Sequence, residues 1–105
     1  MPFVRRVGRA LSGKLTRITL DRFIATHASS GRTLDIGAQN GPYAAFFPNR
    51  IALDIKPGRG VRVIGDAQAL GIASNAFDVV LCTEVLEHLP EPQRAVDEMY
   101  RVLKP

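Results

Sequence analysis

The stretch Leu34-Asp35-Ile36-Gly37-Ala38-Gln39-Asn40-Gly41 decides the fold class of this chain. A short apolar run ends in a carboxylate and opens into a glycine turn. A second apolar run ends in Asp54, 17 positions after Gly37. A strand, a glycine turn and an acid at the tip of the next strand form the pattern by which an α/β sheet holds a nucleotide-like ligand. The glycines let the backbone approach the ligand, and the acid accepts hydrogen bonds from ribose hydroxyls.

Length and composition are those of one small globular domain. The chain has 105 residues, 46% of them hydrophobic, and no apolar run approaches the 18 residues that a membrane span needs. Cys82 is the only cysteine, which excludes an internal disulfide and a multi-cysteine zinc site. We therefore expect a reducing, cytoplasmic setting and no metal centre.

The positive charge is concentrated in an N-terminal arm, residues 1–31, ahead of a main domain at 32–105. Residues 1–32 hold seven Lys and Arg against Asp21 alone, whereas the rest of the chain holds seven basic and nine acidic residues. From about Lys14 to His27 the arm is expected to form a helix with Leu15, Ile18, Phe23 and Ile24 on its apolar side. Three roles stay open for the arm: a helix packed on the sheet, a contact with anionic lipid or a phosphate-bearing substrate, and an organellar transit peptide.

From Thr33 onward strands alternate with helices, which predicts a parallel sheet with crossover connections on its faces. The expected strands are 33–36, 50–55, 61–64 and 77–82. Short helical turns are expected at 42–47 and 84–89. A longer helix should begin at Pro92 and run to about Leu103, burying Ala95, Val96, Met99 and Leu103.

Several short motifs in this order resemble those of class I S-adenosylmethionine-dependent methyltransferases, and in particular the methyltransferase type 11 group. The resemblance covers about residues 32–105. The motifs that carry it are Asp35-Ile36-Gly37, Leu53-Asp54-Ile55, Gly65-Asp66-Ala67, Phe77-Asp78-Val79-Val80, Glu84-Val85-Leu86-Glu87-His88-Leu89 and Arg101-Val102-Leu103-Lys104-Pro105. The resemblance implies a Rossmann-like α/β sheet with strand order 3-2-1-4 in this part of the domain.

The resemblance also implies the residues that bind S-adenosyl-L-methionine. Gly37, Ala38 and Gly41 would form the turn under its methionine part, and Asp35 would fix that turn and hydrogen-bond the cofactor amino group, directly or through water. Asp54 would take the ribose hydroxyls. The other implied cofactor contacts are Ile55 on the adenine, Asp66 and Ala67 at the adenine amino group, and the backbone carbonyls of Cys82 and Thr83 at the methionine end.

Other roles stay open beside these. Asp66 could be only a turn residue, and Asp78 is interpreted as a structural acid at the far end of its strand. His88 would lie near the transferred methyl group, as a general base or as a residue lining the cleft. Gln39 stands where the family usually has a second glycine, so its side chain would either obstruct the methionine carboxylate or hydrogen-bond it.

The implied function is direct, in-line methyl transfer to an O, C or N atom of a small molecule, with no nucleic-acid partner. A cofactor-binding module without turnover and a nicotinamide-dependent oxidoreductase are the alternatives. Because the family continues with further strands, either the chain is a fragment or a partner covers the edge left by strand 77–82. We expect a fragment, whose open sheet edge can self-associate.

Overall fold

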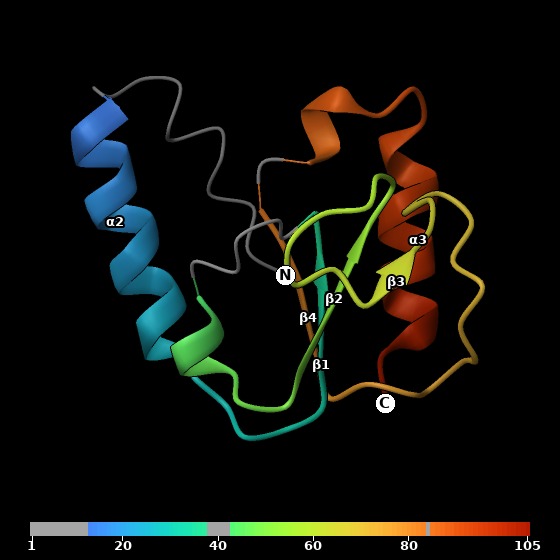
Figure 1. Cartoon of the computed structure of the whole chain (residues 1–105), viewed down its shortest axis with the longest axis horizontal. Coiled ribbons are helices and arrows are strands. Elements are labelled where there is room, and N and C mark those ends of the chain that lie inside the picture. Colours follow the sequence, from blue (N-terminus) through green and yellow to red (C-terminus); the bar gives the residue numbers. More distant parts are fainter. Residues whose placement is uncertain (1–12, 38–42, 84) are drawn as a thin grey trace.

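The computed structural model describes residues 13–37, 43–83 and 85–105, and in these a four-stranded parallel sheet lies between two helices (Figure 1). The strands are β1 (Thr33–Ile36), β2 (Arg50–Asp54), β3 (Val63–Ile64) and β4 (Val79–Cys82), in the order β3-β2-β1-β4. Helix α2 (Gly13–Thr26) lies on one side of the sheet and α3 (Pro92–Val102) on the other. Two 3₁₀ turns complete the described part, η1 (Ala44–Phe46) and η2 (Leu86–His88). The predicted strand order is confirmed.

The α3 side of the sheet holds the larger apolar core. Leu34 and Ile36 of β1 pack there with Ala95, Met99 and Val102 of α3, all at most 2% exposed. Positions 95, 99 and 102 fall on one stripe of a helix, because successive residues turn by about 100°. Val96 and Leu103, which the sequence analysis counted as buried, flank this stripe and are partly buried, and Val102 takes the central place. Pro92 stands in the first turn, as predicted.

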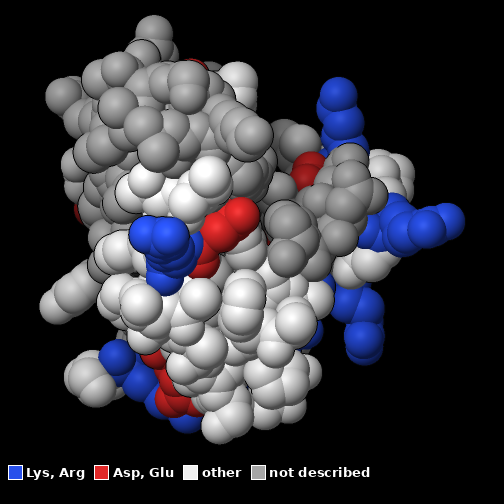
Figure 2. All heavy atoms as spheres, turned by 90° about the vertical axis from the view of Figure 1, so that its left-hand side faces the viewer, with Lys and Arg blue, Asp and Glu red and all other residues white. Residues whose placement is uncertain are grey.

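On the opposite side α2 buries Leu20 and Ile24 against Tyr43, Phe47 and Leu81. The predicted apolar side of this helix was partly wrong, because Ile18 is 43% exposed. Ile18 lies two positions before Leu20 and so points to the opposite side of a 3.6-residue turn. Figure 2 looks onto this side of the molecule and shows a group of acidic and basic atoms on a mainly uncharged surface.

The loop between β3 and β4 is tied to α3 by one arginine. Arg101 donates to the carbonyl of Leu70 (3.0 Å), to Ser74 Oγ (3.1 Å) and to both carboxylate oxygens of Glu98. Glu98 in turn accepts from the Leu70 amide at 2.7 Å. The loop therefore has defined backbone partners even though it forms no regular structure.

Several element boundaries differ from those expected. The strand expected at 50–55 is β2, which ends one residue earlier. The strand expected at 61–64 is β3, which begins two residues later. The helix expected at 42–47 is the single turn η1. Strand β4 starts at Val79 rather than at 77 because Phe77 bridges in parallel to Leu103. Asp78, between them, accepts from the Arg32 amide (2.8 Å) and lies 3.4 Å from Lys104 Nζ. In the described residues no helix is long and apolar enough to cross a membrane.

Candidate functional site

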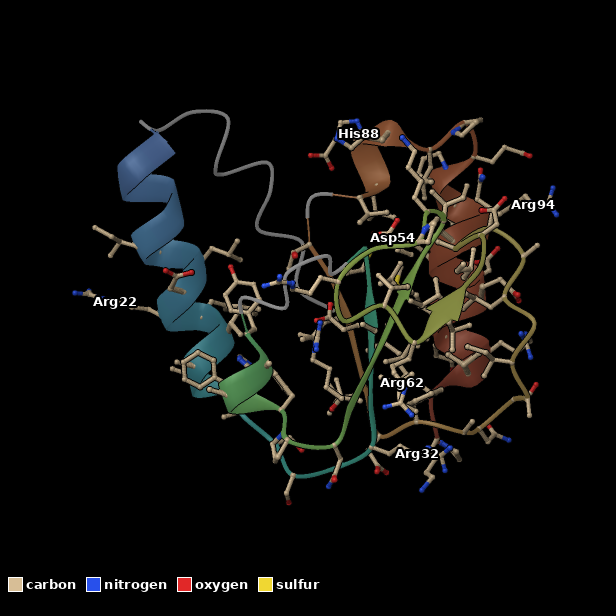
Figure 3. The ribbon with its side chains drawn as sticks, viewed as in Figure 1. Arg22, Arg32, Asp54, Arg62, His88 and Arg94 are labelled. Atoms are coloured by element: carbon tan, nitrogen blue, oxygen red, sulfur yellow. The ribbon has the colours of Figure 1, made fainter. Side chains whose placement is uncertain are left out.

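Three strands of the sheet present their carboxyl ends at one edge. Ile36 of β1 is in register with Leu53 of β2 and with Cys82 of β4. Gly37, Asp54 and Thr83 are the next residues of these three strands, so they stand side by side at the edge. Figure 3 shows Asp54 at this end of β2 and His88 beyond it on η2. Ligands of open parallel sheets bind at the carboxyl ends of the strands, which makes this edge the candidate site.

Gly37 is required at its position by backbone conformation and by space. Its φ is +73°, and its amide donates to the Leu53 carbonyl at 2.7 Å, which locks the end of β1 to β2. A Cβ on Gly37 would lie 2.3 Å from Cγ2 of Val85. Any side chain here would therefore be strained and would collide with the segment that follows β4. Val85 is a site residue that the sequence analysis did not identify.

Asp35 is buried and paired with a residue that the sequence analysis did not identify. Its side chain is 3% exposed, and Oδ2 accepts from Nε of Arg50 at 2.6 Å. Burial raises the pKa of the Asp35 carboxyl, and the hydrogen bond and charge of Arg50 act against that rise. The sequence could have indicated this pair through the two-residue period of a strand. Arg50, the first residue of β2, lies on the same face as position 52, which is in register with Asp35.

Asp54 is the last residue of β2 and Ile55 follows it, and the two side chains are of the kinds that hold a nucleoside. The Asp54 carboxylate is partly buried and accepts from the Lys56 amide through Oδ1 at 3.1 Å. Ile55 follows a buried strand yet is 64% exposed. A carboxylate that can accept hydrogen bonds thus stands next to an open apolar surface.

Asp66 forms a tight turn beside this pair. Its Oδ1 accepts from the amide (2.8 Å) and from the side chain (3.3 Å) of Gln68, and the backbone bond contributes most to lowering the pKa of Asp66. The turn interpretation of Asp66 is therefore observed. Both hydrogen bonds go to Oδ1, so the turn does not use Oδ2. Ala67, the next residue, is buried in the α3-side core.

Cys82 and His88 differ in their access to solvent. Cys82 is buried, and burial raises the pKa of its thiol to about 12, with the charges of Asp35 and Glu87 acting in the same direction. The thiol is thus protonated at neutral pH, and a protonated thiol is the form that is not nucleophilic. His88 is exposed on η2, and Thr83 is partly buried at the strand end. Ala38, Gln39 and Gly41 lie outside the described residues.

No group of three or more His, Cys, Asp or Glu side chains in the described ranges could hold a metal ion. The site contains the Gly37 turn, the carboxylate of Asp54 and the exposed side chain of Ile55, all at the carboxyl ends of parallel strands. These are the features by which α/β proteins of the nucleotide-cofactor-binding class hold their ligands.

Comparison with known proteins specifies the family within that class. The family model described as "Methyltransferase domain" matches residues 34–105, and the chain belongs to this family. An uncharacterized methyltransferase of Mycobacterium leprae is 34% identical over 99% of this chain and 46% of its own length. The demethylmenaquinone methyltransferase of Renibacterium salmoninarum is 39% identical over 70% of this chain and 37% of its own length. The crystal structure of the YcgJ protein of Bacillus subtilis superposes with a TM-score of 0.68 at 28% identity, covering 84% of this chain and 47% of that one.

These matches confirm the resemblance to class I methyltransferases and the Rossmann-like sheet. They also show that the chain spans less than half the length of the curated relatives it matches.

Proposed function

We propose that this chain is the cofactor-binding part of an S-adenosyl-L-methionine-dependent methyltransferase that acts on a small-molecule acceptor at an O, C or N atom. The observation that carries the proposal is the juxtaposition of Gly37, Asp54 and the exposed Ile55 at one sheet edge. The acceptor named for the R. salmoninarum relative, demethylmenaquinone, supports a small molecule as the acceptor class.

The residues at this edge fit the parts of the cofactor. Asp54 would accept hydrogen bonds from the ribose hydroxyls, and Ile55 offers an apolar surface to the adenine ring. Oδ2 of Asp66 would accept from the adenine amino group, because the turn uses only Oδ1. The Gly37 turn would bring backbone close to the methionine part, where carbonyls of Cys82 and Thr83 would also contribute.

The methyl group on the bound cofactor's sulfonium is already electrophilic, so the chain's residues need mainly to align the acceptor and exclude water. Asp35, held by Arg50, would fix the base of the turn from within the sheet. His88 is the side chain proposed to take a proton from the acceptor where the acceptor carries one, since it is exposed at the same edge as Asp54. A cytoplasmic location is part of the proposal, supported by the single cysteine of the sequence.

A module that binds the cofactor without turnover is the second candidate. The described residues support it equally, because Gly37, Asp54 and Ile55 are proposed contacts to the cofactor and not to an acceptor. Both candidates require cofactor binding, and only the first requires methyl transfer.

Calorimetric titration of the chain with S-adenosylhomocysteine and, separately, with NAD tests the proposal. We expect binding of S-adenosylhomocysteine and none of NAD at equal concentrations. Binding of NAD alone would overturn the methyltransferase assignment of the site. A methyl-transfer assay with labelled cofactor then separates the enzyme from the binding module.

A further inference from the structure

The connection from β2 to β3, together with β3 itself, presents basic side chains that have no acidic partner among the residues the structure describes. Lys56, Arg59 and Arg62 are all exposed, and residues 55–64 contain no acid. None of the ion pairs within the described ranges involves any of the three. In Figure 1 this segment lies on the near side of the sheet, and Figure 2 shows Lys and Arg atoms projecting from the corresponding right-hand margin.

Aliphatic side chains are exposed on the same segment. Val63 is 37% exposed and Ile64 is 61% exposed, and both lie on β3, the outermost strand on this side of the sheet. Ile55 is set aside because the proposed function assigns it to the adenine ring. We call Lys56, Arg59, Arg62, Val63 and Ile64 the β3-edge surface.

We propose that the β3-edge surface binds the headgroup region of an anionic phospholipid bilayer. Long basic side chains keep their charges among lipid phosphates while their stems and neighbouring aliphatic groups enter the acyl boundary. The chemistry favours lipid over single-stranded nucleic acid, because bases bind by stacking on aromatic rings, and all the apolar members here are β-branched aliphatics.

Protection of a sheet edge is the ordinary role of such charges, and it explains only half of the observation. Lys and Arg on an outer strand do discourage pairing with another chain. That role does not require a large aliphatic side chain to face water, however, and Ile64 is one of the most exposed apolar residues of the described chain. Charge and apolar surface together are what an interfacial lipid contact uses.

Co-sedimentation with sucrose-loaded vesicles tests the proposal on the purified chain without cofactor. Vesicles of phosphatidylcholine alone are compared with vesicles that contain a third of phosphatidylglycerol. We expect binding only to the anionic vesicles, falling as salt is raised from about 50 to 300 mM because the charges are screened. Since each basic residue near such a surface contributes about five-fold, Lys56→Gln/Arg59→Gln/Arg62→Gln should lower partitioning on the order of 100-fold.

The matched control removes the same number of charges elsewhere, as Arg22→Gln/Arg32→Gln/Arg94→Gln. Figure 3 shows Arg22 on α2, Arg94 on α3 and Arg32 before β1, where its guanidinium lies 5.5 Å from the centre of the Phe77 ring. Both triple variants are first compared by thermal melting. A control within about three-fold of the unmodified chain supports the proposal, and equal losses in the two variants overturn it.

Ile64→Ser tests the apolar part by itself and leaves the net charge unchanged. It should weaken binding several-fold at all salt concentrations. An unmodified chain that fails to sediment with anionic vesicles also overturns the proposal. So does retention only by heparin or by an acidic protein.

Discussion

Replacing Gly37 by alanine should destabilise the protein through two separable effects. The residue has a φ of +73°, and an L-residue in this left-handed region costs about 1–2 kcal/mol. The new Cβ would also lie 2.3 Å from Cγ2 of Val85, a contact that real Cβ atoms do not show. Overpacking of this kind costs about 1–3 kcal/mol. The expected loss in the free energy of unfolding is therefore about 2–5 kcal/mol.

A double-mutant cycle with Val85→Ala separates the two effects, because this substitution removes Cγ2. In the double variant the collision is gone and only the backbone cost remains, so the two substitutions should couple favourably by about 1–3 kcal/mol. Gly60→Ala is the matched control for the backbone term. Gly60 has a φ of +80°, and a Cβ there would meet nothing within 4 Å.

Urea denaturation followed by circular dichroism gives the free energies of unfolding for these variants. Gly60→Ala should cost only about 1–2 kcal/mol. Additive effects of Gly37→Ala and Val85→Ala would refute the contact between the glycine turn and the segment after β4. An equal cost at the two glycines would refute it as well.

Three further predictions rest on contacts in the sheet and its connections. Arg50→Gln leaves Asp35 buried without its charge partner, which should cost about 3–5 kcal/mol at pH 7. Burial raises the pKa of Asp35 in the folded chain, so the free energy of unfolding falls as the pH rises through that pKa and the buried carboxyl ionises. Arg50 stabilises the ionised carboxylate, so without Arg50 this fall is larger. The deficit in urea unfolding should thus be smaller at pH 4 than at pH 7, and equal deficits would contradict this reasoning. Cys82, with a pKa raised to about 12 from 9.0, should react with iodoacetamide roughly 1000-fold more slowly in the native chain than in urea, and equal rates would show that the thiol is accessible. Arg101→Met should speed hydrogen exchange at the Leu70 amide, with no change at the Leu34 amide in β1, because it removes the contacts that hold the β3–β4 loop on α3.

The sheet could be predicted from the sequence because its strands carry local signals. Strand 33–36 was predicted with the observed bounds, since the apolar run between two glycines is too short for a helix and is typical of a buried strand. Strand 77–82 came out shorter because Phe77 pairs with Leu103, a partner 26 positions away that no local pattern shows.

Helix faces were harder to predict than helix positions. Helix α2 lies close to the expected 14–27, yet Ile18 was assigned to the buried side and Leu20 was missed. A helix with apolar residues on several sides leaves its orientation to tertiary packing, here to Tyr43, Phe47 and Leu81.

The site shows the same limit. The acids at strand ends are visible in the sequence because each follows an apolar run. The partners of these groups are not, since the Arg50–Asp35 pair and the Gly37–Val85 contact depend on strand register and on a connection that returns over the turn. The ligand roles assigned to the site residues remain predictions.

Cofactor binding at Asp54 is the central claim, and the affinity for S-adenosylhomocysteine of three proteins tests it most directly. The unmodified chain is compared by calorimetry with Asp54→Ala and with Asp97→Ala, a control at an exposed carboxylate on α3. Loss of charge-assisted hydrogen bonds to the ribose should weaken binding by about 1.5–3 kcal/mol in Asp54→Ala, and Asp97→Ala should bind like the unmodified chain. An Asp54→Ala protein that melts like the unmodified chain and binds S-adenosylhomocysteine equally well would contradict the account.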